Sequence, residues 1–81
     1  MAIQFLRPVE VMNATGLPKS SLYERAARGE FPRPLKMGAR AAFWPAHEVE
    51  AWQRAVLAGA SRERLRELVQ ALEAARKGEA A

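Results

Sequence analysis

Basic and hydroxyl side chains gather in one part of the chain, between positions 19 and 40. Lys19, Ser20 and Ser21 directly follow a proline, at the predicted start of a helix. Such donors at the N-terminal end of a helix can bond DNA phosphates or base edges in the major groove. The hydroxyl of Tyr23 suits a phosphate oxygen, or else its ring is partly buried in the core. The residue types indicate recognition of a polyanion.

The net charge of +4 falls entirely within this segment. Residues 19–40 carry six basic and two acidic side chains, whereas the charges of residues 1–18 and of residues 41–81 cancel. Localised positive charge is typical of nucleic-acid-binding proteins, although a solvated surface of a basic protein would give the same count. The candidate DNA-binding residues are Lys19, Ser20, Ser21, Tyr23, Glu24, Arg25, Arg28, Arg33, Lys36 and Arg40.

Glu24 is the acidic exception on the helix face that would approach DNA. It could accept a hydrogen bond from a cytosine amine. We favour a local ion pair with Arg28, four residues further along the same face. Arg28 would then lie close to the DNA backbone.

Helix-breaking glycines and prolines, together with the spacing of apolar residues, predict the helices and strands that position these side chains. A short helix from Pro8 ends before Gly16, and a second helix runs from Pro18 to just before Gly29. Because so few residues join them, the two helices must cross steeply, as in a helix-turn-helix.

A small hairpin is predicted after the second helix. Prolines at positions 32 and 34 exclude helix there, and the alternation that follows predicts two short strands with a turn at Gly38-Ala39. Lys36 and Arg40 lie outward near the tip, where a wing can reach a flanking phosphate or the minor groove. Arg33, held extended between two prolines, could do the same.

A third helix is expected from Pro45, and Ser61 is expected to cap a fourth. The fourth helix has an apolar stripe that either folds back on the third helix or pairs with a second copy of the chain, and we favour self-association. The stripe consists of Leu65, Leu68, Val69 and Leu72. The expected organisation is a DNA-binding domain over residues 1–58, a C-terminal helix over 59–77 and a frayed tail over 78–81.

The composition argues against an enzyme. One histidine and no cysteine exclude an ordinary zinc site and disulfides, and no glycine-rich phosphate loop is present. His47 has no neighbouring group in the sequence to make it a general base. Trp44 and Trp52 are expected in the core. We therefore expect no catalytic residue, cofactor or metal. Without a membrane-spanning run or signal peptide, a cytoplasmic location is expected.

Several ordered segments resemble the AlpA family, small prophage-associated regulators related to excisionases and to the DNA-binding domain of MerR proteins. The segments are Phe5-Leu6-Arg7, Val11, Thr15-Gly16-Leu17, Ser20-Ser21-Leu22-Tyr23, Arg28-Gly29-Glu30-Phe31-Pro32, Lys36-Met37-Gly38-Ala39-Arg40, Trp44 and Glu48-Val49-Glu50-Ala51-Trp52.

The resemblance implies a mainly α-helical winged helix-turn-helix with a small β-hairpin, in which the second helix enters the major groove. Two positions depart from the family, because Glu24 stands where a basic residue is usual and Arg25 where an apolar one is usual. The resemblance implies that DNA is contacted by Ser20, Ser21, Tyr23, Lys36 and Arg40.

The expected function is sequence-specific binding of double-stranded DNA by a transcriptional regulator of a prophage or mobile element. One alternative is an excisionase-like architectural factor that bends DNA for a recombinase. Another is a protein-interaction module that uses its basic patch to bind an acidic partner. Besides DNA, the candidate partners are a second copy of the chain through the fourth helix, a recombinase and RNA polymerase.

Overall fold

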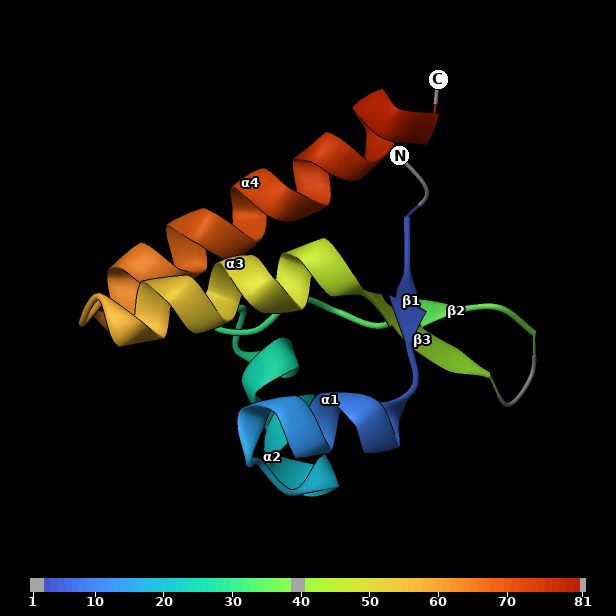
Figure 1. The fold of residues 1–81 in the computed structure, drawn as a ribbon. Helices are drawn as coiled ribbons and strands as arrows, with labels where there is room; N and C mark the ends of the chain where they lie inside the picture. Colours follow the sequence, from blue (N-terminus) through green and yellow to red (C-terminus); the bar gives the residue numbers. More distant parts are fainter. Residues whose placement is uncertain (1–2, 39–40, 81) are drawn as a thin grey trace.

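The computed structural model describes residues 3–38 and 41–80, which form several helices and a small sheet that lies at one end of them (Figure 1). This architecture confirms the prediction of a mainly α-helical winged helix-turn-helix with a β-hairpin. The described elements are β1 (Phe5–Leu6), α1 (Pro8–Thr15), α2 (Lys19–Ala27), β2 (Leu35–Lys36), β3 (Ala42–Pro45), α3 (Ala46–Leu57) and α4 (Arg62–Ala80).

The turn between α1 and α2 consists of residues 16–18. Gly16 ends α1 with φ at +73°, a backbone conformation that a residue with a Cβ rarely adopts. Pro18 is the N-cap of α2, where its missing N–H costs nothing. The glycine and the proline that predicted where the two helices end and begin therefore mark these positions in the structure as well.

The sheet has three strands rather than the two of the predicted hairpin. β3 lies in the centre and pairs antiparallel with β2 on one side and β1 on the other. Leu35 faces Phe43 in the hairpin, and Leu6 faces Trp44 in the additional pair. The base of the hairpin is thereby joined to the N-terminal segment of the chain.

Both tryptophans lie in the core, as predicted, and each is fixed by a hydrogen bond to the segment after α2. The indole Nε1 of Trp44 donates to the carbonyl of Pro32 at 2.7 Å, and that of Trp52 donates to the carbonyl of Glu30 at 2.9 Å. The ring of Phe31 lies edge-on to both indoles, with centroids 6.0 and 5.0 Å away. These contacts tie the end of α2 to β3 and α3.

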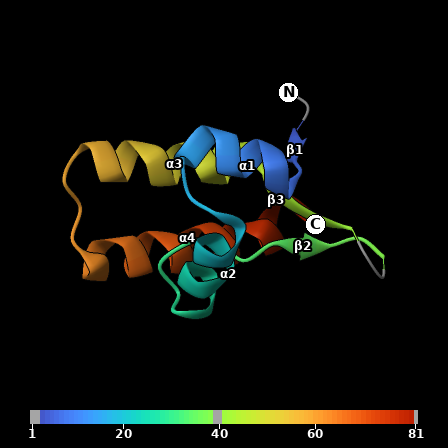
Figure 2. The ribbon, with the colours of Figure 1, turned by 90° about the horizontal axis from the view of Figure 1, so that it is seen from below.

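α4 runs antiparallel to α3 and packs against it (Figures 1 and 2). Leu65 and Val69 are buried within the chain, at 7% and 3% exposure, and Leu68 and Leu72 are partly buried. The apolar stripe therefore folds back on the chain. The burial of Leu65 and Val69 supports the alternative in which the stripe folds back on α3. Self-association through α4 stays a prediction.

Helical backbone in α4 continues to Ala80, past Gly78, where a frayed tail was predicted to start. A glycine within a helix costs about 1 kcal/mol relative to alanine but does not by itself end the helix. The division of the chain at residue 58 stays a prediction.

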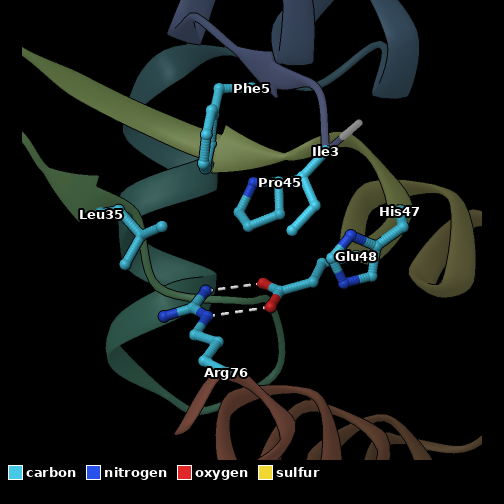
Figure 3. Close-up of a pocket in the computed structure, with 7 residues that line it drawn as sticks. All are labelled: Ile3, Phe5, Leu35, Pro45, His47, Glu48 and Arg76. Atoms are coloured by element: carbon cyan, nitrogen blue, oxygen red, sulfur yellow. Dashed lines mark hydrogen bonds and ion pairs between the residues drawn. The ribbon is translucent and has the colours of Figure 1, made fainter. Parts of the chain in front are cut away.

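Two buried glutamates that precede α4 in the chain form ion pairs with arginines of α4. Arg66 donates to Glu30 at 2.9 Å, and Arg76 donates to both carboxylate oxygens of Glu48 at 2.8 and 2.6 Å (Figure 3). The hydrogen bonds to Glu48 raise the pKa of Arg76, although its partial burial acts in the opposite direction. Arg76 also donates to the backbone carbonyl of Arg33 at 2.7 Å. α4 is therefore held by ion pairs as well as by apolar packing.

Candidate nucleic-acid interface

α2 turns an apolar side to the core and a polar side to solvent. Leu22 and Ala26 are buried four residues apart. At about 100° per residue, the opposite side of the helix carries Ser20, Glu24 and Arg28, all of which are exposed. We call this side the reading face, because a helix-turn-helix places such a side in the major groove.

Different elements border the reading face on its two flanks (Figure 2). Seen from below, the hairpin of β2 and β3 lies to one side of α2, and the first turns of α4 lie to the other. Lys19 and Tyr23 lie on the side of α2 next to the hairpin, which we call the wing flank. Ser21 and Arg25 lie on the opposite side, which we call the α4 flank. Both flanks are hollowed, and basic side chains line both hollows.

The hollow on the wing flank is formed by Lys19 and Tyr23 together with residues of α1 and β3, and by Arg7. The partly buried ring of Tyr23 meets Trp44 edge-on, with centroids 5.7 Å apart. Both interpretations of Tyr23 therefore have support, because its ring packs on the core while it borders a basic hollow. The guanidinium carbon of Arg7 lies 6.0 Å from the ring centroid of Phe43. The sequence analysis missed Arg7, which joins this hollow through the pairing of β1 with β3.

On the α4 flank, Ser21, Arg25 and Arg28 line a hollow with Arg62, the first residue of α4. The sequence analysis missed Arg62 as well. No local pattern indicated it, because the charges of residues 41–81 balance and the position of α4 depends on the tertiary fold.

The acid on the reading face has a cationic partner. Glu24 and Arg28, both exposed, form an i, i+4 ion pair, which is the favoured alternative of the sequence analysis. The pair removes most of the repulsion that a lone carboxylate would exert on a phosphate. It also means that Arg28 presents less net charge than its sequence position suggested.

The wing cations are only partly described. Lys36 is exposed on β2, next to the tip of the hairpin, as expected. Arg40 lies outside the described residues. Arg33 is exposed and lines a hollow with Arg66 and Glu73 of α4, and its contact with DNA stays a prediction. Its backbone N–H donates to Glu73 at 3.0 Å, which holds the segment between the prolines against α4.

Most of the arginines of α3 and α4 are ion-paired. Within residues 3–38 and 41–80, the cations that pair with an acid outside α2 are Arg54 with Glu50 at 3.8 Å, Arg64 with Glu67 at 3.5 Å, Arg66 with Glu30 and Arg76 with Glu48. Lys19, Arg25 and Lys36 have no acidic partner among the described residues. Cations without an acidic partner therefore border α2 and the wing, and among the described residues Arg62 and Lys77 of α4 have no such partner either.

In the described part of the chain, histidine and acidic side chains do not gather into any group of three or more that could hold a metal ion. None of its helices is long and apolar enough to cross a membrane.

Comparisons with known proteins agree with this geometry. The model of the family described as prophage CP4-57 regulatory protein (AlpA) matches residues 4–57. The uncharacterized protein ORF88 of enterobacteria phage P4 is 41% identical over 59 residues, which cover 73% of this chain and 67% of that protein. No solved structure is significantly similar. The family match includes α1, α2, the sheet and α3, and it ends before α4.

Proposed function

Because the chain belongs to the AlpA family of prophage regulatory proteins, we propose that it binds double-stranded DNA sequence-specifically and regulates transcription of a prophage or mobile element. The observation that carries this proposal is the placement of the cations without acidic partners around the reading face of α2. Such a protein acts in the cytoplasm, where bacterial and phage DNA is accessible.

In this proposal, α2 enters the major groove with its N-terminal end first. Ser20 on the reading face and Ser21 beside it have short hydroxyl side chains that can donate to or accept from base edges. Lys19 and Arg25 lie on opposite flanks of the helix, where each can neutralise a phosphate of one strand. Base contacts by the serines would give specificity, and the cations would give affinity.

The wing adds a contact outside the major groove. Lys36 is exposed on an edge strand whose partner, β3, is held in the core by Trp44. A cation on a supported hairpin is well suited to a flanking phosphate or to the minor groove, whose negative potential attracts basic side chains.

Selection of bound duplexes from a random pool tests this function. We expect a shared sequence motif among the retained duplexes, and we expect Ser20→Ala to change the preferred bases without changing the salt dependence of binding. Retention of duplexes without a shared motif would contradict sequence-specific regulation. No retention of DNA at low salt would contradict DNA binding and favour a module for an acidic protein partner.

The selected motif also allows the architectural alternative to be tested. An excisionase-like factor would bend the duplex, so fluorophores at the two ends of a short DNA would approach each other on binding. A regulator that acts through promoter occupancy requires no such change. A large bend, together with unchanged transcription from a promoter carrying the motif, would contradict the proposed regulatory role.

A further inference from the structure

We propose that Arg62, at the start of α4, is a DNA-phosphate contact that acts with Arg25 on the α4 flank of the reading face. The inference rests on the proposed DNA binding and extends it beyond residues 4–57, which the family model matches. Arg62 would thus make the start of α4 a second basic border of the reading face, opposite the wing.

The first observation is the position of Arg62. Its side chain lines the same hollow as Ser21 and Arg25 of α2, although Arg62 is far from both of them in the sequence. The ion pair between Arg66 and Glu30, one turn further along α4, holds the start of α4 beside the end of α2. Figure 2 shows these first turns of α4 on the side of α2 away from the hairpin.

The second observation concerns which charged side chains of this hollow already form ion pairs. Its two acids, Glu24 and Glu30, already have cationic partners, since Glu24 pairs with Arg28 and Glu30 with Arg66. In the described part of the chain, Arg25 and Arg62 have no acid within ion-pair distance. The hollow therefore keeps two positive charges for an external anion.

The dimensions of DNA explain why both flanks of α2 should carry cations. The major groove is about 12 Å wide, and a helix with its side chains has a diameter of about 10–12 Å. A helix in the groove is therefore bordered by a phosphate backbone on each side. Lys19 and Arg7 line the wing flank, and Arg25 with Arg62 would serve the opposite strand.

Another arginine of the same helix provides a matched control. Arg64 is exposed, as Arg62 is, but it lines a hollow with Ala55, Ala58 and Leu68 between α3 and α4. It also pairs with Glu67 at 3.5 Å. Replacing either arginine by alanine removes one positive charge from the first turn of α4, but only Arg62→Ala removes it from the α4 flank.

The test compares the affinity of the intact chain and its variants for one duplex over a range of salt concentrations. We expect Arg62→Ala to weaken binding about fivefold at 0.15 M salt and to reduce the slope of log K against log salt by about 0.9, the value for one phosphate. Arg62→Lys should keep the slope, and Arg64→Ala should leave affinity and slope unchanged. Melting curves should show that Arg62→Ala keeps the wild-type stability. If Arg62→Ala is less stable than the wild-type chain, Arg62→Gln replaces it in the binding test, with the same expected loss of affinity and of slope.

The outcomes separate this inference from the proposed function. If the wild-type chain binds DNA with a steep salt dependence but Arg62→Ala behaves as Arg64→Ala does, the role of Arg62 is wrong and DNA binding stands. Equal losses in the Arg62→Ala and Arg64→Ala variants would show an effect of net charge and would also overturn the specific role. If the wild-type chain does not bind DNA, the proposed function itself fails.

Discussion

Arg76 near the end of α4 holds both carboxylate oxygens of Glu48, a fully buried acid in the first turn of α3 (Figure 3). Removing one partner of such a pair leaves an uncompensated buried charge. Arg76→Met should therefore lower the free energy of unfolding by about 3–5 kcal/mol, as measured by urea denaturation.

Two further variants identify the cause of that loss. Arg64→Met removes an exposed arginine from the same helix and should change stability by less than about 0.5 kcal/mol. Glu48→Gln in the Arg76→Met background should recover a large part of the loss, because it removes the unpaired charge. No recovery would contradict the electrostatic explanation. Because pairing raises the pKa of Arg76, its contribution is present at neutral pH and is lost as pH rises through that raised pKa.

The apolar stripe of α4 can be tested with two leucines of different exposure. Leu65 is 7% exposed and belongs to the core cluster, whereas Leu57 at the end of α3 is 87% exposed. Leu65→Ala should cost about 2–5 kcal/mol in thermal or urea unfolding, and Leu57→Ala should cost almost nothing. Equal small effects would show that α4 does not pack on α3 as described.

Removing charge next to the reading face should weaken DNA binding without changing specificity. The double variant Lys19→Ala, Lys36→Ala should lose affinity on the order of 30-fold at 0.15 M salt, equally for all duplexes, with a slope reduced by about 1.8. The control is Arg54→Ala with Arg64→Ala, two exposed arginines that already pair with acids. If both double variants lose the same affinity, only the total charge matters, and the assigned surface is wrong.

Glu24 allows the two interpretations of an acid on the reading face to be separated. If it only pairs with Arg28, Glu24→Gln frees that guanidinium, so affinity should rise and the salt slope should steepen by about 0.9. If it accepts a hydrogen bond from a cytosine amine, the same variant should instead bind the selected site more weakly and tolerate other bases at one position. We expect the first result. Competition between the selected duplex and single-base variants would reveal the second.

The local signals of the sequence were sufficient for the elements that carry the site. Gly16 and Pro18 lie at the two ends of the turn between α1 and α2, as predicted. Both tryptophans lie in the core, which was also predicted. β1 could not be predicted in the same way, because it has two residues and its partner strand lies about 40 positions further along the chain. Short strands of this kind depend on tertiary pairing and have no periodicity of their own.

The sequence located the basic segment and the local pair of Glu24 with Arg28, but it could not assign partners that are distant along the chain. An acid in the first turn of a helix, such as Glu48, fits the helix dipole and gives no sign that it is buried. Its partner Arg76 is 28 residues away, and Glu30 and Arg66 are 36 residues apart. For the same reason Arg62 was counted among the balanced charges of residues 41–81. Only the fold shows which cations remain without an acid.

The dependence of duplex-DNA affinity on salt tests the central claim most directly. Arg7, Lys19, Arg25 and Lys36 lie around α2 and the wing and have no acidic partner in the described part of the chain. At about 0.9 for each phosphate, these cations alone predict a slope of log K against log salt of about −3.5, and the contact proposed for Arg62 would make it steeper. A clearly shallower slope, or no binding of duplex DNA at low salt, would contradict the assignment of this surface as a DNA-binding face.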